Sequence, residues 1–245
     1  MRIGEKGKLM PRVFDRNMFI MLFSIMIGVV IITFFAADIM ARTSTEEELT
    51  TRYTAEKKEL EEKNTNFTTR LLSSLSYFDK ARELRSQGNY NFDLAYIWYT
   101  TTLNEDEEEK FTAYKNDTIT HCMHAIENYS LGYDNFGVAK SMFTNTMNYS
   151  GKFSNLVNLY VNLTQSAAKL CMLRETASNY LIDLAENLTY VDGAASFKQN
   201  MSNITELLNN TLAEYMQELG NYNELEDGIE REYNIVGFSE IREEL

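Results

Sequence analysis

The residues best suited to chemistry in this chain are its two histidines, which lie three positions apart. His121 and His124 share one face of an expected helix with Asp117 and Asn128, at successive spacings of four, three and four residues. Imidazole and carboxylate groups at such spacings can ligate a transition metal. The stripe offers no fourth strong ligand, so a solvated polar face is the preferred interpretation and no metal site is predicted.

Other spacings typical of catalysis or of cofactor binding are missing from the sequence. It holds no nucleophile motif, no glycine-rich phosphate loop and no paired-cysteine motif. The two cysteines, Cys122 and Cys171, are too few for a disulfide scaffold, and two free, buried thiols are favoured over one bridge between them. We therefore expect no enzyme activity, no cofactor and no metal.

An apolar segment near the N-terminus sets the expected location of the chain. Residues 18–37 read MFIMLFSIMIGVVIITFFAA and contain no charge, and about 20 such residues cross the hydrocarbon core of a bilayer. Basic residues, which are retained in the cytoplasm, precede the segment at Arg2, Lys6, Lys8, Arg12 and Arg16. We expect a signal anchor over 18–40 in the cell membrane, a cytoplasmic tail over 1–17 and an extracytoplasmic remainder. A cleaved secretory signal is the alternative.

Glycosylation sequons agree with an outward-facing C-terminal part. Nine Asn-x-Ser/Thr sequons follow the apolar segment, more than twice the number that 23 asparagines and 37 serines and threonines give at random. Such acceptors are typical of the surface of secreted segments. Asn200 and Asn203 lie near an expected apolar helix face and are expected to stay unmodified. The remaining sequons are expected to carry glycans: Asn66, Asn116, Asn128, Asn148, Asn162, Asn187 and Asn209.

The composition after the anchor predicts an acidic, all-α domain. Residues 43–245 carry 33 acidic and 17 basic residues, a net charge of −16, which repels nucleic acid and anionic lipid surfaces. Pro11 is the only proline, whereas a loop-rich or all-β domain would use several. A nucleic-acid partner is therefore excluded, and long helices are expected.

A charge-rich segment over 41–66 predicts a helical stalk. Tyr53, Leu60 and Phe67 recur every seven residues, but Glu56 and Lys63 occupy the second seam position of the heptad. This is half of a coiled-coil seam. A homo-oligomer formed through the stalk is left open.

Residues 67–245 carry a period of 44 residues. The Gly-Asn-Tyr-Asn motif of 88–91 recurs at 220–223, and Gly132 lies one period after Gly88. Such a period is typical of stacked supersecondary units. We expect each unit to be two antiparallel helices that meet near the glycine, giving a stack of hairpins or an elongated helical bundle. Breaks between units are expected at Asn104, Ser150-Gly151 and Asp192-Gly193.

Apolar stripes at helical spacing mark the expected core. The three stripes are Ile119, Cys122, Ile126 and Tyr129; Leu156, Leu159, Leu163, Leu170 and Leu173; and Ile204, Leu207, Leu208, Leu212 and Tyr215. Packing between helices is the preferred interpretation of all three.

The first unit resembles the centre of a tetratricopeptide repeat. Ala81, Leu84 and residues 88–90 match the small residue and the glycine-polar-tyrosine turn that join two antiparallel helices in that family. The likeness covers roughly 15 residues of each unit, and the family period is 34 rather than 44 residues. Asp93 also stands where the family has alanine. The resemblance implies a helical stack that binds partners by its surface, and it assigns no ligand.

The densest aromatic cluster predicts a partner-binding surface, with packing between helices as the alternative. It comprises Tyr90, Tyr96, Trp98 and Tyr99. The function expected from the sequence is that of a single-pass, membrane-anchored helical scaffold or protein-interaction subunit with an acidic extracytoplasmic domain. A ligand-sensing helical ectodomain that signals through a partner is the alternative. An enzyme is the third hypothesis, and the sequence offers no catalytic site to support it.

Overall fold

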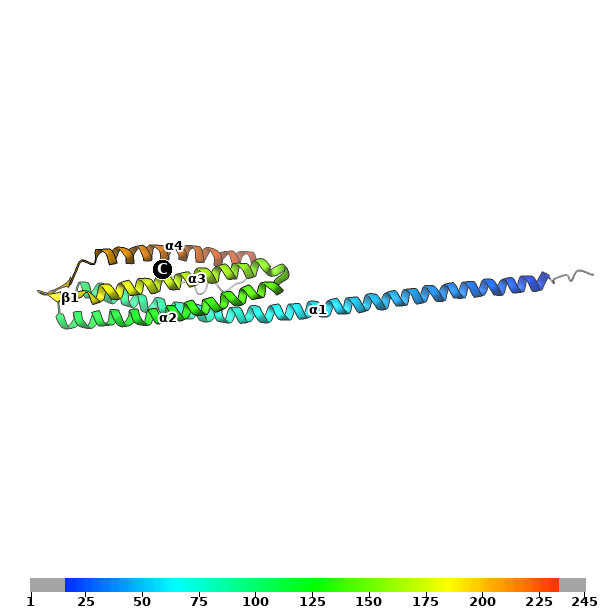
Figure 1. Ribbon diagram of the computed structural model, residues 1–245, viewed down its shortest axis with the longest axis horizontal. Helices are drawn as coiled ribbons and strands as arrows, with labels where there is room; N and C mark the ends of the chain where they lie inside the picture. The colour runs from blue at the N-terminus through cyan, green and yellow to red at the C-terminus, as the bar shows by residue number, and fades with distance from the viewer. Residues whose placement is uncertain (1–15, 234–245) are drawn as a thin grey trace, which may run out of the picture. The chain divides into compact units, whose positions relative to one another are not determined.

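Long helices make up most of the described part of the chain. The computed structural model describes the backbone of residues 16–233 and the side chains of residues 47–233. In chain order the elements are α1 (Arg16–Leu103), α2 (Glu108–Ser150), the 3-10 turn η1 (Gly151–Phe153), α3 (Ser154–Glu186), β1 (Leu188–Val191), β2 (Ala194–Phe197) and α4 (Ser202–Tyr233) (Figure 1). The expected all-α class is confirmed.

The predicted membrane anchor concerns residues whose side chains are not described. Only the backbone is described for the apolar run over 18–37, and residues 1–15 of the basic tail lie outside the described residues. Within the part of the chain that was searched, no helix combines the length and apolar character needed to span a bilayer.

Contacts divide the chain into two units, Met1–Glu62 and Lys63–Leu245. In the first unit, every described side chain from residue 47 to residue 62 is exposed. Tyr53 and Leu60, the two seam residues predicted there, are 69% and 68% exposed. The helix is supported locally by the i,i+4 pair of Arg52 with Glu48, at 3.4 Å. Pairing through this stalk stays a prediction.

The second unit is a bundle of four antiparallel helices, in which α1 takes part from residue 63 onward. Figure 1 shows α2, α3 and α4 side by side, with the β-hairpin at the end where α2 begins. Helix α3 is the central element because fifteen of its residues are buried, against seven in α4. Side chains join neighbouring helices through Asn89–Tyr129, Lys140–Gln165, Ser166–Glu218 and Arg82–Glu226.

An aromatic cluster fills the middle of the bundle. Phe78 of α1 lies against Phe136 of α2, with ring centroids 5.6 Å apart, and against Tyr160 of α3 at 6.3 Å. Phe143 stacks on Tyr160 at 5.1 Å. All four rings are at most 3% exposed. Offset-stacked and edge-to-face pairs of this kind add about 0.5–1.5 kcal/mol each beyond the area they bury.

The glycines of the 44-residue period lie inside helices, so the expected hairpins at these glycines are wrong. Gly88 is within α1 and Gly132 within α2. The two glycines allow α1 and α2 to approach closely. A Cβ atom on Gly88 would lie 2.7 Å from the Tyr129 ring, and one on Gly132 would lie 3.5 Å from the Ala81 carbonyl oxygen. The tetratricopeptide resemblance therefore mistook a helix-crossing point for a turn.

The breaks expected between units agree with turns and helix ends in the structure, unlike the expected hairpins at the glycines. Helix α1 ends at Leu103, and α2 gives way to η1 at Gly151. Asp192 and Gly193 form a turn with φ values of 52° and 84°, which is the geometry of a type I′ β-hairpin. The hairpin between β1 and β2 was not expected, although Asp-Gly between β-favouring residues is its usual signal.

Lys198, which directly follows the β-hairpin, places its ammonium group at the C-terminal end of α3. Lys198 donates to the Glu186 carbonyl oxygen at 3.0 Å. Lys115 of α2 donates to the same oxygen at 3.1 Å and to the Leu188 carbonyl oxygen at 2.8 Å. Cations at this end of a helix satisfy its last carbonyl groups and its dipole. Burial and the charge of Lys198 lower the pKa of Lys115.

The two cysteines are free and buried. Cys171 of α3 lies level with Gly132, whose Cβ would be 3.3 Å from its sulfur. Cys122 is ten residues from Gly132, which corresponds to about 15 Å along α2. That offset is too long for a disulfide. Burial raises the pKa of Cys122 to about 12, so its thiol stays protonated at neutral pH and is a poor nucleophile.

The close approach at Gly88 predicts opposite effects for two glycine-to-alanine substitutions. Gly88→Ala is expected to lower the free energy of unfolding by about 1–3 kcal/mol, because the new methyl group meets the buried Tyr129 ring. Gly137→Ala on α2 meets nothing within 4 Å and should raise it by up to about 1 kcal/mol. Denaturant unfolding of the 43–245 fragment measures both. Equal shifts would contradict the close approach.

Because Leu163 lies in the core, replacing it with a charged residue is expected to destabilise the bundle strongly. Leu163 is 0% exposed, so Leu163→Asp should cost about 3–5 kcal/mol in unfolding free energy by removing a packed leucine and burying a carboxylate. Leu131→Asp is the matched control, because Leu131 is 47% exposed on α2. Thermal unfolding followed by circular dichroism compares the two. An unchanged melting temperature for Leu163→Asp would exclude this packing.

Candidate functional site

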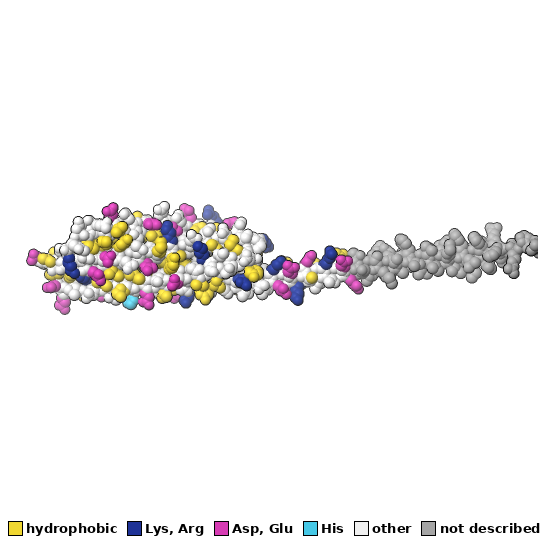
Figure 2. All heavy atoms as spheres, in the orientation of Figure 1, with side chains coloured by type: hydrophobic (Ala, Val, Ile, Leu, Met, Phe, Trp, Pro, Cys, Tyr) yellow, Lys and Arg dark blue, Asp and Glu magenta, His cyan; other side chains and the backbone are white. Residues whose placement is uncertain are grey.

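A groove lies where α1, α3 and α4 meet, and we call it the α1–α4 groove. Its volume is about 360 Å³. Six of its eight lining residues are apolar or aromatic, and the other two form an ion pair. The lining residues are Phe92, Asp93, Tyr96, Ile97, Arg174, Leu212, Tyr215 and Met216. Exposed apolar side chains also gather in patches over the visible face of the bundle (Figure 2).

Arg174 forms the floor of the α1–α4 groove. Its guanidinium lies 4.4 Å from the centroid of the Phe92 ring and 4.2 Å from that of Tyr215, between the two rings. It also pairs with Asp93 at 3.5 Å. Two cation–π contacts on a side chain that is only 13% exposed hold the guanidinium firmly. The arrangement ties α3 to both α1 and α4.

The charge of Arg174 is secured by its neighbours. Burial alone would lower the pKa of Arg174, but Tyr215, Tyr129 and Asp93 outweigh burial and raise it. The guanidinium therefore stays charged at any physiological pH. Its Nε atom is buried and has no hydrogen-bond partner. The groove is thus apolar at its walls and cationic at its floor, with the exposed Asp93 carboxylate at its rim.

The four aromatic residues of the predicted binding surface lie in different environments in the structure. Tyr96 lines the groove and is 40% exposed, and Tyr90 is 66% exposed. Trp98 stacks on Tyr114 of α2, with ring centroids 5.0 Å apart. Tyr99 is 8% exposed and belongs to the core, which corrects its assignment to a binding surface. The cluster therefore serves both packing and surface, because consecutive residues of a helix face different directions.

Several groove residues escaped sequence reasoning. Leu212 and Tyr215 were assigned to a core stripe, and Met216 was given no role. Arg174 directly follows Leu173 of the apolar stripe of α3. An arginine beside an apolar stripe is the sequence feature that could have indicated this site. Its partner Asp93 lies 81 residues earlier in the chain, so their pairing could not be read from spacing.

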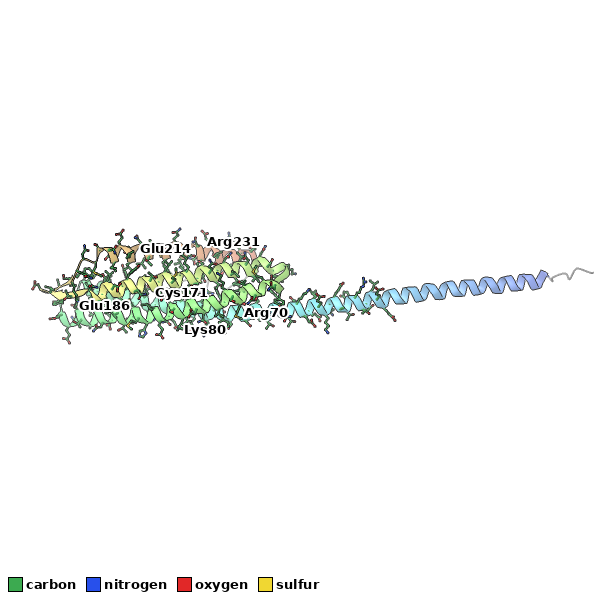
Figure 3. All side chains as sticks on the ribbon, in the orientation of Figure 1. Arg70, Lys80, Cys171, Glu186, Glu214 and Arg231 are labelled. Carbon is green, nitrogen blue, oxygen red and sulfur yellow. The ribbon has the colours of Figure 1, made fainter. Side chains whose placement is uncertain are left out.

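Helix α4 is held against its neighbours by buried carboxylates. Glu218 accepts hydrogen bonds from Ser166 at 2.5 Å and from Lys169 at 2.9 Å. Glu226 pairs with Arg82 at 3.5 Å and accepts from Tyr222 at 2.6 Å. Both carboxylates come from α4, on which Figure 3 labels the neighbouring Glu214, and both cations come from other helices. Such pairs fix the register of a helix more than they add stability.

The hydrogen bonds at Glu218 determine its protonation. Burial alone would raise the pKa of Glu218, but the bonds from Ser166 and Lys169 outweigh burial and lower it. Its carboxylate therefore remains ionised at neutral pH. Lys169 in turn bridges Glu218 and the more exposed Glu214, at 3.5 Å from the latter.

Other hollows are less suited to a function. One, of about 920 Å³, is an open depression at the start of α4 lined mostly by polar residues, and Asn200 and Asn209 of two sequons lie in its wall. A second hollow, of about 450 Å³, lies between α2 and α3 beside Lys140 and Gln165. A third, of about 320 Å³, lies on α1 next to Asp79 and Glu83. The α1–α4 groove differs from these in that a guanidinium held between two aromatic rings lies among its apolar walls.

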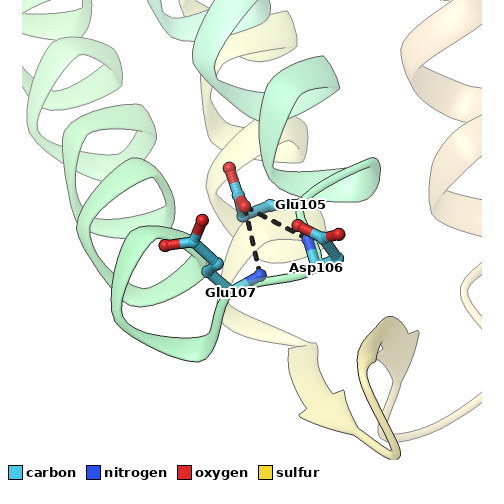
Figure 4. Close-up of side chains that lie close together, drawn as sticks. All are labelled: Glu105, Asp106 and Glu107. Carbon is cyan, nitrogen blue, oxygen red and sulfur yellow. Dashed lines mark hydrogen bonds between the residues drawn. The ribbon is translucent and has the colours of Figure 1, made fainter.

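Three carboxylates gather in the loop between α1 and α2 (Figure 4). Glu105 accepts hydrogen bonds from the backbone N–H groups of Asp106 at 3.2 Å and Glu107 at 3.1 Å. Glu107 pairs with Lys110 at 2.7 Å. Glu105 satisfies two backbone N–H groups just before α2. The negative charges of the cluster are also favourable at this end of the helix, where the dipole is positive. Helix α2 begins at Glu108, four residues after the break expected at Asn104.

The histidines and the sequons occupy the surface. His121 contacts the Asn91 side chain at 3.2 Å, and His124 is exposed. None of the nine sequon asparagines, all of which are described, is buried. Asn200 and Asn203, which were expected to lie near an apolar face, are as exposed as the others.

Comparisons with protein families, with curated proteins and with solved structures found no match to this chain.

The bonds to Glu218 predict a dependence of stability on pH. Because its pKa is lowered in the folded state, its contribution is present above the unfolded value of roughly 4.3 and is lost as pH falls through the folded value. Glu218→Gln should cost about 1–3 kcal/mol at pH 7 and less at pH 3. Urea unfolding at both pH values measures this. Glu206→Gln, on an exposed part of α4, should cost under about 0.5 kcal/mol.

Proposed function

We propose that this protein is a membrane-anchored interaction subunit that presents a helical bundle on the extracytoplasmic side through a helical stalk. The apolar run over 18–37 and the basic residues before it support the anchor and its orientation. The exposed, charge-rich helix over 47–62 supports the stalk. The bundle that follows supplies the surface for a partner protein.

The distribution of sequons carries this proposal. Sequons fall at Asn66 on α1, on α2, on α3, on either side of the β-hairpin and on the first part of α4, but none falls on α1 between 67 and 103 or on α4 after 211. These two segments lie side by side, because Arg82 pairs with Glu226 and Arg85 lies over the Tyr222 ring at 4.4 Å. One face of the bundle is thus kept free of glycan acceptors.

That free face is not explained by a lack of asparagine. Its two segments contain Asn89, Asn91, Asn221 and Asn223, and none of the four is followed two positions later by Ser or Thr. A glycan is bulky and would exclude a docking protein. The α1–α4 groove opens on this face, since its lining comes from Phe92–Ile97 and from residues 212–216 in addition to Arg174. The groove therefore borders two segments without acceptors, and the acceptor Asn209 lies two turns before Met216 on the same side of α4.

Ligand sensing is a second candidate that one observation favours. The α1–α4 groove, at about 360 Å³, falls at the lower end of the range for small-molecule sites. Its fixed Arg174 could orient a polar group. The exposure of Ile97 and Met216, 56% and 47%, favours the broader contact of a protein.

Photo-crosslinking in cells tests the interaction face. A photoreactive residue replaces Ile97 in the full-length chain, and the matched control replaces Met123, which is 61% exposed on α2. We expect a discrete adduct of higher mass from position 97 and none from position 123. Adducts from both positions, or from 123 alone, would contradict the assignment.

The orientation of the chain in the membrane can be tested in the same cells. Protease added to intact cells should remove the bundle, and glycosidase should lower the mass of the chain if the sequons are used. Full protection of the bundle until the cells are lysed would exclude an extracytoplasmic location.

A further inference from the structure

We propose that the α1–α4 groove and the acidic side chains beside it form a docking surface for a basic, amphipathic helix of a partner protein. An apolar side chain of that helix would enter the groove, and its lysines and arginines would lie along the carboxylates. This inference rests on the proposed function and names the class of partner.

The first line of carboxylates lies on α1. Asp79, Glu83, Asp93 and Ile97 fall within an arc of about 80° around the helix, because each is separated from Asp79 by close to a multiple of 3.6 residues. All four are exposed. From Asp79 to Ile97 the face extends for about 27 Å at 1.5 Å per residue. That length matches about five turns of a docked helix.

The second line of carboxylates lies on α4. Its residues Ser202–Tyr233 include eight acidic residues and one basic residue. Because α4 runs antiparallel to α1 and Glu226 pairs with Arg82, the nearby Glu224 and Glu230 lie level with the stretch of α1 between Asp79 and Glu83. Glu230, four residues after Glu226, adds to the acidic end of this face, whereas Glu224 lies about 160° around α4 from Glu226 and faces away from α1.

Three arginines near these carboxylates point inward, whereas Lys80 of α1 and Arg231 of α4 are exposed. Arg82 is 11% exposed and is committed to Glu226. Arg85 is 5% exposed and lies over the Tyr222 ring. Arg174 is held between Phe92 and Tyr215 beneath the groove. The surface that a partner meets is consequently negative, while the buried positive charges hold the helices together.

Charge complementarity selects the occupant. A second copy of this chain, with its net charge of −16 over 43–245, would bring like charges together, and so would an anionic lipid surface or nucleic acid. A cationic segment satisfies the carboxylates. The apolar walls of the groove require an apolar anchor in addition, which an amphipathic helix supplies at spacings of three and four residues.

Peptide titration of the full-length chain in phosphatidylcholine nanodiscs tests the surface, with empty nanodiscs as the blank. The probe is an 18-residue helix of lysine with leucine at every third or fourth position, and the control peptide carries glutamate in place of lysine. Fluorescence anisotropy measures each Kd. We expect saturable binding of the lysine peptide that weakens with salt, and no binding of the glutamate peptide.

Matched variants locate the binding on this face. Ile97→Gln with Met216→Gln should raise the Kd at least about tenfold, as should Asp79→Lys with Glu83→Lys. Met123→Gln and the pair Asp117→Lys with Glu127→Lys make equivalent changes on exposed parts of α2, and should change it by less than about twofold. Circular dichroism confirms that each variant is folded. Equal losses on both faces, or binding of both peptides, would overturn the proposal.

The photo-crosslink at position 97 separates this inference from the proposed function. An adduct to a basic, helix-forming segment supports both, as read by mass spectrometry of the linked peptide. An adduct to an acidic or neutral segment overturns the basic partner and leaves the interaction face standing. No adduct at position 97 contradicts the proposed function itself.

Discussion

The close approach of α1 and α2 at Gly88 is the constraint on which the rest of the bundle depends. The Tyr129 ring lies where a side chain at position 88 would be, and its hydroxyl donates to the Asn89 side chain at 2.6 Å. Burial raises the pKa of Tyr129 well above its ordinary value, so the hydroxyl remains a donor. This contact fixes the axial position of the two helices. The sulfur of Cys171 then packs at Gly132, which sets the level of α3.

Helix α4 is attached by a different kind of interaction. Helices α1 to α3 meet through rings such as Phe78, Phe136 and Tyr160, whereas α4 buries the carboxylates of Glu218 and Glu226. A buried ion pair offsets much of its own gain by desolvation. Its value here is positional, because it holds α4 in one register. That register places Leu212 and Met216 opposite Ile97 and so creates the groove.

The proposed function and the proposed partner share one physical basis. The predicted glycan acceptors lie largely outside α1 between 67 and 103 and α4 after 211, and these two segments border the groove. Exposed acidic and apolar side chains border the groove, while Arg82, Arg85 and Arg174 are turned inward. A surface of this kind attracts a cationic partner at long range and retains it by burying an apolar anchor.

The sequence alone determined the helical class, the acidic surface, the breaks near Asn104 and Gly151, and the burial of Leu163. These follow from local properties: proline content, charge, turn residues and apolar spacing. It misassigned Gly88 and Tyr99, and it left Met216 without a role. A glycine at a turn and a glycine at a helix crossing look the same along the chain, and only the contact with Tyr129 distinguishes them. The groove was likewise decided by tertiary structure, because Asp93, Arg174 and Met216 come from three helices whose mutual register depends on packing rather than on sequence spacing.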